Sequence, residues 1–471
     1  MTSDTTALVW FRGGLRLRDN RCLYEALKAN TKVYCCFILD DFYMRGRDIG
    51  PARAAFLLDT LAVLENDLTA AGSGLILRYA TDIPGECAKL AQTLGAGRVY
   101  AHRDYLPYPI ARDHKVAQLL QADGRDLVLL DDQLAVPPED VKTEAGTPYT
   151  VFTPFKRRWE STLKFEPLME TTGLFHHLAP VPPGLAQPIP VLADFGLTLR
   201  QTIETAGEHA AQQTLHKFAS LGLNGYNENR DIAALGNSTS RLSVHLKWGT
   251  ISIRDCVRTA LANGAAGALK WLDELAWRDF YYHIGFHFPH VYNGPMLREY
   301  SDFPWIDTPE HFDRWKEGRT GYPFVDAGMR QLNATGWMHN RLRQVTASYL
   351  CKDLCVDWQR GEQYFMEMLT DGDWPSNNGG WQWVAGCGTD PRRATRIFNP
   401  VLQQQRYDPD FAYVKQWVPE WGTSSYPTVP VVEHAEGRRR YLQIFGETAG
   451  ARLQIRAKGS AVPHIDQPSL F

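Results

Sequence analysis

The sequence predicts two unlike parts: an α/β, Rossmann-like N-terminal domain with a parallel sheet, and a larger all-α C-terminal domain. Three observations predict this division. The first third of the chain alternates short apolar runs with stretches of helical spacing, and almost everything after residue 200 has helical spacing alone. A proline-rich stretch separates the two patterns. At 471 residues the chain is also too long for one typical domain.

Five apolar runs in the first third have the length and β-branched content of buried strands: 7–11, 33–39, 75–80, 98–102 and 127–132. Three segments between them carry apolar residues at helical spacing: 51–71, 84–95 and 110–123. Alternation of this kind gives a mostly parallel sheet with helices on both faces. No GxGxxG sequence follows the first run, so the usual dinucleotide fingerprint is absent.

The boundaries follow from where the pattern lapses. The stretch "APVPPGLAQPIPVLADFG" (179–196) has the proline density of an extended linker that crosses the surface. We therefore expect these parts: an α/β domain over 1–134, a linker over 135–200, an α-helical domain over 201–456 and a flexible tail over 457–471.

Composition places the chain among ordinary cytoplasmic globular proteins. The net charge of −3 means that any nucleic-acid contact must use a local basic patch. No basic and apolar leader opens the chain, and no apolar run is long enough to span a bilayer. The 8 cysteines form no CxxC pair with companion ligands, so neither a metal site nor a disulfide framework is indicated. We expect a monomer with no membrane association.

Three segments of the second half combine charged, amide and aromatic side chains. The first, 271–283, places Trp271, Glu274 and Arg278 on one helix face, which alone is best explained as a buried ion pair among core aromatics. The second, 335–358, reads as one strong helix. The third, "DGDWPSNNGGWQW" (371–383), supplies carboxylates that could pair with an arginine of the second.

Several long motifs, in the same order, resemble the photolyase/cryptochrome family. They are "VWFR..LRLRDN" (9–20), "TSRLSVHLKWG" (239–249), "TGYPFVDAGMRQLNATGWMHNRLR" (320–343), "DGDWPSNNGGWQW" and "RIFNPVLQQQRYDP" (396–409). The resemblance spans roughly residues 5 to 445. Within the family, Trp277, Trp383 and the "NNGGWQW" run are similar to bacterial class I cyclobutane-pyrimidine-dimer photolyases. The resemblance implies light-driven splitting of ultraviolet-damaged DNA by a reduced, folded-back FAD.

The resemblance also implies a set of cofactor contacts in the helical domain. Asn377 would face flavin N5, Arg343 paired with Asp371 would lie against the ring edge, and Gly380 would let the backbone approach the cofactor. Hydroxyls before a helix would meet the pyrophosphate. The matching positions are Tyr226, Thr239, Ser240, Arg241, Leu242, Ser243, Trp271, Arg278, Trp337, Asn340, Arg343, Asp371, Asp373, Asn377 and Gly380.

Three tryptophans match the family's electron-transfer chain. Trp381 would stand next to the flavin, and Trp358 and then Trp305 would lead to the surface. Indole is readily oxidised, and a series of short hops is faster than one long one. The alternative interpretation is that the three are ordinary core tryptophans.

The substrate of such an enzyme is a damaged dinucleotide that must leave the duplex. By resemblance, Trp277 and Trp383 would form an aromatic wedge for it, and Glu274 would hydrogen-bond it or, when protonated, stabilise its radical anion. Arginines would hold the DNA backbone, which predicts salt-sensitive and sequence-tolerant binding. The predicted DNA contacts are Arg230, Glu274, Trp277, Arg278, Asn340, Arg341, Gln344, Trp383 and Arg396, with Arg392 and Arg393 extending the patch.

The sequence departs from the class I pattern at three places. Gln344 stands where a methionine is usual and is similar to DASH cryptochromes, so strand preference stays open. Asp104 and Lys247 match the antenna site of deazaflavin-binding relatives, which implies 8-hydroxy-5-deazaflavin or FMN as second chromophore. However, Gly13 and Gly14 replace a polar–Asp pair there, which could enlarge the cleft, suit a different flavin or leave the cleft empty.

The last five residues, Gln467–Phe471, resemble the peptide that docks bacterial repair proteins on the sliding clamp. The main functional hypothesis is dimer repair. The alternatives are a cryptochrome-type blue-light photoreceptor and a DASH-like enzyme that prefers single strands. A (6-4) photoproduct lyase is disfavoured, because its histidine-rich pocket motif is not seen.

Overall fold

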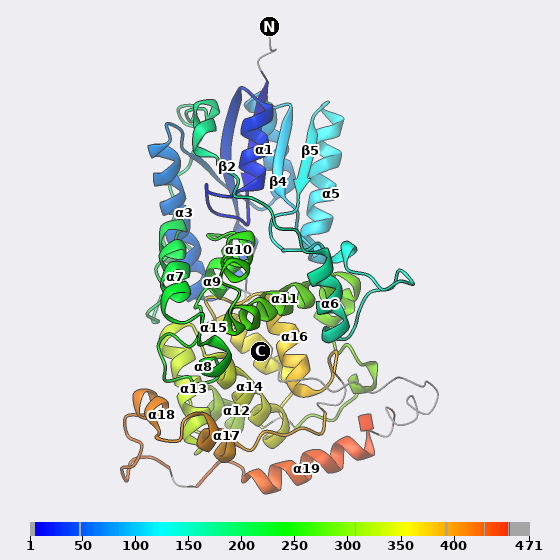
Figure 1. The fold of residues 1–471 in the computed structure, drawn as a ribbon, viewed down its shortest axis with the longest axis vertical. Helices are drawn as coiled ribbons and strands as arrows, with labels where there is room; N and C mark the ends of the chain where they lie inside the picture. The colour runs from blue at the N-terminus through cyan, green and yellow to red at the C-terminus, as the bar shows by residue number, and fades with distance from the viewer. Residues whose placement is uncertain are drawn as a thin grey trace.

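A computed structural model of the chain describes residues 5–46, 49–306, 308–390, 394–427, 429–450 and 452. Figure 1 shows a sheet domain above a larger body of helices, with the last helix lying across the bottom. Three predictions fall outside the described residues: the tail over 457–471, the clamp peptide Gln467–Phe471, and the pair Arg392 and Arg393.

The N-terminal domain is a five-stranded sheet in the order β3-β2-β1-β4-β5, and every neighbouring pair is parallel. The strands are β1 (Thr6–Phe11), β2 (Lys32–Asp40), β3 (Leu75–Ala80), β4 (Arg98–His102) and β5 (Asp126–Leu130). Apolar clusters cover both faces of the sheet, which is why β1 and β2 are apolar throughout rather than alternating. The predicted α/β class and all five strands are confirmed.

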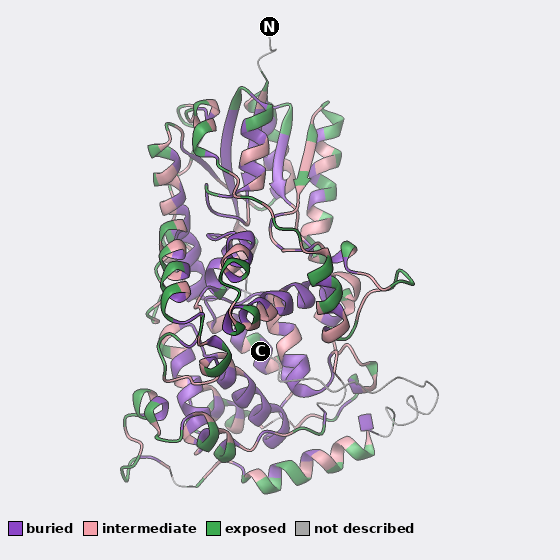
Figure 2. Ribbon diagram, in the orientation of Figure 1, coloured by how far each residue is buried: buried purple, intermediate pink, exposed green. Residues whose placement is uncertain are grey.

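Helices pack on both sides of this sheet: α1 (Arg21–Ala29), α2 (Asp41–Arg45), α3 (Pro51–Ala70), α4 (Ile83–Thr93) and α5 (Pro107–Ala122). In Figure 2 the inner faces of these elements are buried and their outer faces are exposed. The long helix α3 reaches the second domain, where the buried Arg53 donates hydrogen bonds to the carbonyls of Met366 and Gly372.

The segment predicted as an interdomain linker, 135–200, contains a helix, α6 (Phe152–Thr162), that the sequence did not predict. The run of apolar residues is short but has helical spacing, since Phe152, Phe155 and Trp159 recur at intervals of three and four. All three side chains are buried. The indole N–H of Trp159 donates to Asp279 at 2.9 Å, which fixes α6 against the helical domain. The rest of the segment holds only short 3₁₀ turns: Pro138–Asp140, Thr172–His177 and Leu192–Phe195.

The second domain is helical, as predicted. Its helices are α7 (Glu208–Leu221), α8 (Tyr226–Asn229), α9 (Ser243–Trp248), α10 (Ile253–Asn263), α11 (Ala266–His287), α12 (Pro309–Lys316), α13 (Pro323–Thr335), α14 (Asn340–Ser348), α15 (Trp358–Met368), α16 (Trp374–Ala385), α17 (Pro400–Tyr407), α18 (Ala412–Trp417) and α19 (His434–Glu447). Short 3₁₀ turns are Pro289–Tyr292 and Arg298–Tyr300. The core runs continuously around α11 and α16.

The single helix expected over 335–358 is broken. Gly336 ends α13 in the left-handed conformation at φ 66°, and α14 begins only at Asn340. A π-helical turn, Tyr349–Asp353, then follows α14, and Cys355 at φ 58° ends the helical path. The glycine was a visible stop signal that the strong periodicity after it obscured.

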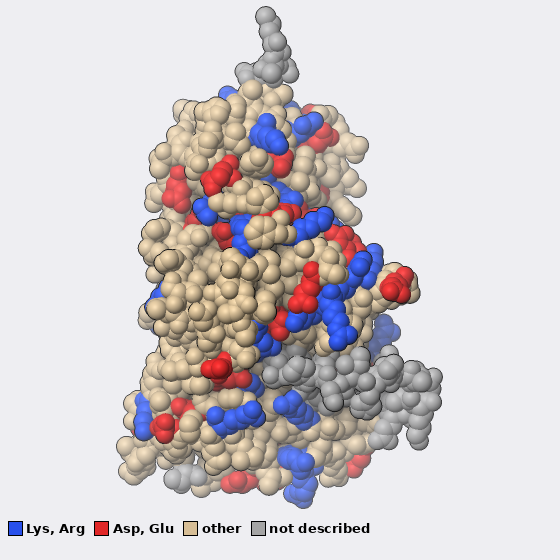
Figure 3. Space-filling view, viewed as in Figure 1, with Lys and Arg blue, Asp and Glu red and all other residues tan. Residues whose placement is uncertain are grey.

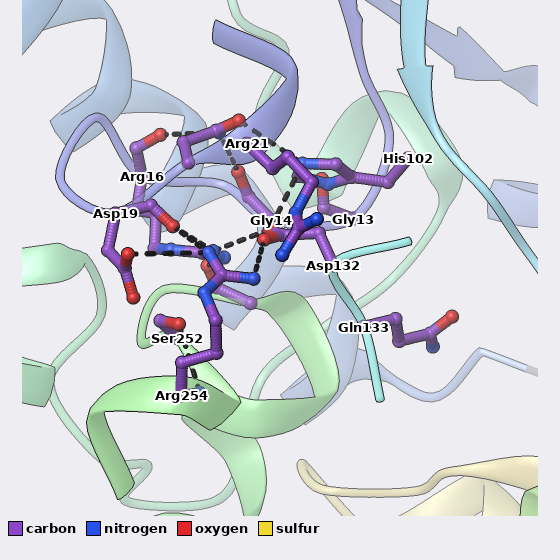
Figure 4. Close-up of polar contacts among 12 residues, drawn as sticks. Gly13, Gly14, Arg16, Asp19, Arg21, His102, Asp132, Gln133, Ser252 and Arg254 are labelled. Atoms are coloured by element: carbon purple, nitrogen blue, oxygen red, sulfur yellow. Dashed lines mark hydrogen bonds and ion pairs between the residues drawn. The ribbon is translucent and has the colours of Figure 1, made fainter. Parts of the chain in front are cut away.

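A buried group of ion pairs joins the two domains (Figure 4). Asp132, after β5, binds Arg16 of the N-terminal domain and Arg254 of α10, and the His102 ring lies 3.1 Å from it. Arg254 and Arg258 also pair with Asp19. Together these six residues, the interdomain ion cluster, fix the domains to each other.

The outer surface near the junction also carries charge of both signs. Figure 3 shows basic and acidic side chains interleaved where the sheet domain meets the helices. None of the helices that the structure describes has the length and apolar character needed to cross a bilayer. Within the same described ranges, no three histidine, cysteine or acidic side chains come together as metal ligands, and the 8 cysteines are free and buried.

Candidate cofactor and damaged-base cavity

A deep cavity opens inside the second domain among α9, α11, α14 and α16. We call it the helical-domain cavity. The volume open to the centre of a water-sized sphere is about 290 Å³. Every residue predicted for the cofactor lines it: Tyr226, Thr239, Ser240, Arg241, Leu242, Ser243, Trp271, Arg278, Trp337, Asn340, Arg343, Asp371, Asp373, Asn377 and Gly380. Motifs that are far apart in the sequence therefore meet at one place.

The lining has two chemical halves that suit a cofactor with a flat ring and an anionic part. Hydroxyls of Thr239, Ser240 and Ser243 lie at the start of α9, where backbone N–H groups are also available. Apolar and aromatic surface from α11 and α16, with amide and charged groups between, forms the other half. These donors fit the phosphates and the ring of FAD.

The carboxylates of the loop before α16 are held from two sides. Asp371 accepts both hydrogen bonds of an ion pair with Arg343, at 2.8 and 3.1 Å, as the sequence predicted. Gly372 between the two acids has no room for a side chain, because a Cβ would stand 1.8 Å from the Arg53 guanidinium. Asp373 caps α16, whose first turn contains Trp374, Pro375 and Ser376. The proline suits this first turn because no N–H is needed there.

Asn377 reaches the cavity with its amide orientation fixed. Its Nδ2 donates to the Glu362 carbonyl at 3.0 Å, so its carbonyl oxygen stays available on the other side. The neighbouring Asn378 donates to the Glu362 carboxyl group at 2.9 Å. Glu362 is buried, and burial raises its pKa to about 7, although the Asn378 hydrogen bond opposes the rise.

Glu274 lies in the cavity wall beside Arg230, with its side chain 18% exposed. Burial raises the pKa of Glu274, and the attraction of Arg230 acts against this. The two side chains form an ion pair, and the Arg230 guanidinium also lies over the Tyr226 ring. Arg230 is therefore buried against a carboxylate. A phosphate contact would require an open surface, and Arg230 does not lie on one.

Arg341 is also buried, unlike the solvent-facing cation expected from the sequence. Its guanidinium donates to Asp231 at 2.8 Å and to the Gln344 amide oxygen at 3.0 Å. Gln344 lines the cavity and is 2% exposed. Because the amide oxygen of Gln344 accepts from Arg341, the N–H₂ group of this amide is directed away from Arg341. Of the other predicted phosphate contacts, Arg396 is exposed and Arg278 lines the cavity.

Of the two tryptophans predicted for the aromatic wedge, Trp277 and Trp383, only the first lines the helical-domain cavity. Trp277 lines the cavity, and its ring stacks on Phe152 with centroids 3.5 Å apart and planes at 12°. Trp383 is buried and lies outside the cavity lining, whereas Trp381 is part of it. The reason is helical geometry, since residues two apart on α16 face opposite sides.

The three tryptophans of the predicted electron-transfer chain differ in burial in the expected order. Trp381 at the cavity and Trp358 at the start of α15 are buried, and Trp305 is partly exposed. Gly361 permits the close packing of α15 on α16, because a Cβ there would stand 2.2 Å from the Trp381 ring. Whether electrons travel along them stays a prediction.

A second cavity, the interdomain cavity, lies between the domains and is smaller, about 90 Å³ by the same measure. Both predicted antenna residues line it, and each also makes a contact within the protein. Lys247 binds Asp373 of the helical-domain cavity at 3.2 Å, and Asp104 accepts from the N–H groups of Tyr105 and Leu106. The Gly14 space is taken by the His102 ring, 1.9 Å from where a Cβ would stand. The antenna role of Asp104 and Lys247 stays a prediction.

Sequence reasoning missed five residues that shape these cavities: Arg53, Gln133, Phe152, Tyr282 and Glu362. Each acts on a residue distant in sequence, and none belongs to a local pattern of a site. Only Phe152 and Arg53 left a usable signal, since one opens an apolar helical repeat and the other is a charged residue within the apolar first two turns of α3.

Comparisons with known proteins agree with this geometry. A family model described as DNA photolyase matches residues 7–174, and one described as the FAD binding domain of DNA photolyase matches residues 271–425. A deoxyribodipyrimidine photo-lyase of Synechococcus is 37% identical over 480 residues, covering 96% of this chain and 98% of the relative.

Two solved structures have the same fold. A bacterial class III photolyase from Agrobacterium tumefaciens superposes with a TM-score of 0.86 at 33% identity, covering 95% of this chain and 98% of that one. An archaeal photolyase from Sulfolobus tokodaii, solved with two FAD molecules, has a TM-score of 0.82 at 30% identity, covering 94% and 100%.

Proposed function

Because the chain belongs to the DNA photolyase family, we propose that it splits cyclobutane pyrimidine dimers in ultraviolet-damaged DNA with FAD as cofactor. The observation that carries the proposal is the helical-domain cavity. It gathers the residues predicted for the cofactor, together with Glu274, Trp277 and Gln344, which are predicted for the damaged base. When bound and reduced, FAD would supply the light-driven electron that opens the dimer.

The chain's own residues would bind and orient both partners. The hydroxyls before α9 would hold the pyrophosphate, and the Arg343–Asp371 pair would lie at the ring edge with its charge already balanced. Asn377 would present its amide oxygen at the ring. An amide can meet the ring without adding a fixed charge.

Three groups would receive the flipped dimer. Trp277, held from behind by Phe152, would stack on a base without reading its sequence. Glu274 would hydrogen-bond the dimer, with Arg230 as the positioning residue that fixes it. Gln344, whose amide oxygen accepts from Arg341, would lie against a base of the dimer. Arg278 and Arg396 would meet the DNA backbone.

The test is light-dependent repair of oligonucleotides that carry one dimer, both single- and double-stranded, by purified protein with reduced FAD. We expect repair under near-ultraviolet or blue light and none in the dark. Repair of single strands alone would identify a DASH-like enzyme. Photoreduction of FAD without repair of either strand would contradict the proposal and favour a photoreceptor that uses Trp381, Trp358 and Trp305.

Two further parts of the proposal have separate tests. A second chromophore of the 8-hydroxy-5-deazaflavin or FMN type would add an absorption band to that of FAD in the purified protein. The Sulfolobus relative with its two FAD molecules supports a flavin-type group, although Asp104 and Lys247 are engaged elsewhere. Docking on a sliding clamp would be lost when Gln467–Phe471 is deleted.

A further inference from the structure

Lys247 lies in the wall between the two cavities and lines both of them. It is near the end of α9, and its side chain is 17% exposed. Its ammonium group is 3.2 Å from the Oδ1 atom of Asp373, on the side of the helical-domain cavity. The sequence motif assigned Lys247 to the interdomain cavity, but the ion pair it forms belongs to the other one.

Asp373 is the centre of a hydrogen-bonded chain that joins the cavities. The Tyr282 hydroxyl donates to its Oδ1 at 2.8 Å, and Ser376 donates to its Oδ2 at 3.1 Å. The same Tyr282 hydroxyl accepts from Gln133 at 2.7 Å, and Gln133 lines the interdomain cavity. Oδ1 of Asp373 is thus fixed by Lys247 and Tyr282, which lie outside the motif 371–383, and Oδ2 is fixed by Ser376 within it.

The charge of Asp373 depends on this surrounding. A buried carboxylate is costly unless a cation balances it. Burial favours the neutral form, but Lys247 and then Arg278 outweigh it and lower the pKa of Asp373. The remaining titratable groups that face it are Tyr282 and Tyr292, and both are neutral phenols at ordinary pH. Arg278 is shared, since it also binds the Gln133 carbonyl at 2.8 Å.

We propose that Lys247 is a positioning residue of the helical-domain cavity, which holds Asp373 charged and in place for the cofactor, and is not a ligand of an antenna chromophore. The proposal rests on the proposed function only in that FAD is taken to occupy this cavity. It does not depend on whether the protein repairs DNA.

The test measures FAD release as the pH is lowered, followed by the fluorescence of the freed cofactor. Lys247→Met removes the charge, so Asp373 takes up a proton more readily and FAD is released at a pH about one unit higher than from the wild type. Lys247→Arg keeps the charge and stays close to the wild type. Lys415→Met, an exposed lysine on α18, is the matched control and leaves the midpoint unchanged.

A double-mutant cycle locates the effect. In an Asp373→Asn background the carboxylate is gone, so Lys247→Met should produce no further shift in the release midpoint. Lys247→Gln replaces the Met variant if that protein does not fold. The proposal is overturned by a wild-type midpoint in Lys247→Met, or by a shift that persists undiminished in the Asp373→Asn background. It is also overturned if Lys247→Met loses a second chromophore's absorption band while FAD release is unchanged.

Discussion

Glu362 shows how much one buried acid can control in this protein. Its carboxyl group accepts from Asn378, and its backbone carbonyl fixes the amide of Asn377 at the cavity. Because the pKa of Glu362 is raised to about 7, its charge changes near neutral pH. Only Asn377 separates it from the cavity that would hold the flavin. We expect the carboxyl group of Glu362 to cause any pH dependence of cofactor binding that the Lys247–Asp373 pair does not explain.

Glu362→Gln tests this at the level of stability. The folded state binds the Glu362 proton more tightly than the unfolded state, so the free energy of unfolding falls as the pH rises from about 4.5 to about 7. We expect this fall to be smaller in Glu362→Gln than in the wild type, by about 3 kcal/mol. Urea denaturation at pH 5 and pH 8 measures it.

The exposed Glu310 on α12 supplies the control, since Glu310→Gln should keep the wild-type pH dependence. If Glu362→Gln retains the full wild-type slope, the carboxyl group is charged in the folded state across this range, contrary to the expectation.

At the level of elements, α11 carries both the cavity wall and the attachment of α6. Trp271, Glu274, Trp277 and Arg278 lie on its cavity side, and Asp279 on another side receives the Trp159 indole of α6. The helix α6 in turn places Phe152 against Trp277. A segment that looked like linker is therefore a structural support of the base-binding surface.

Phe152→Ala should remove that support. Large-to-small changes of buried phenylalanine cost about 3 to 5 kcal/mol of unfolding free energy, and the freed Trp277 ring should bind dimer-bearing DNA less tightly. Denaturant unfolding and a binding titration measure the two effects. Phe165→Ala is the matched control, because that side chain is 66% exposed and should cost no more than about 0.5 kcal/mol. Equal losses in both variants would refute the supporting role of Phe152.

For the molecule as a whole, the interdomain ion cluster is the main polar connection between the sheet and the helices. Burial opposes the ionisation of Asp132. Arg16, His102 and Arg254 outweigh this effect and lower the pKa of Asp132. The stabilisation is therefore present above pH 3.8, the ordinary value for the carboxyl group, and is lost as the pH falls further. The neighbouring His102 is kept neutral, since burial lowers its pKa to about 4.

Asp132→Asn should be strongly destabilising, because it leaves Arg16 and Arg254 buried without their carboxylate. We expect a loss of about 3 to 5 kcal/mol that changes little with added salt. Thermal and denaturant unfolding at low and high salt measure this. Asp41→Asn breaks only the exposed pair with Arg45 and should cost under about 1 kcal/mol. A small, salt-dependent loss for Asp132→Asn would show that the cluster does not join the domains.

The sequence predicted the fold class, the five strands and a set of residues that the structure brings together around one cavity. Strands and helices could be predicted because they follow from the local spacing of apolar residues. The residues predicted for the cofactor could be found because they lie in long motifs. It failed where a contact joins distant residues. The length of the helix over 335–358 was overestimated because Gly336 was outweighed by the periodicity around it. Arg230 and Arg341 were expected to hold the DNA backbone, and their ion pairs with Glu274 and Asp231 cannot be inferred from spacing alone.

The backbone contact between the domains limits how this chain can be recombined with its relatives. Gly14 and Gly249 come from different domains, and a Cβ on Gly249 would stand 2.3 Å from the Gly14 nitrogen. Beside them, the Leu15 N–H donates to the Trp248 carbonyl at 3.0 Å. A chimera that joins the sheet half of this protein to the helical half of a relative with a side chain at position 249 would meet a steric conflict at the junction. Chimeras that keep this sheet half should therefore carry glycine at position 249.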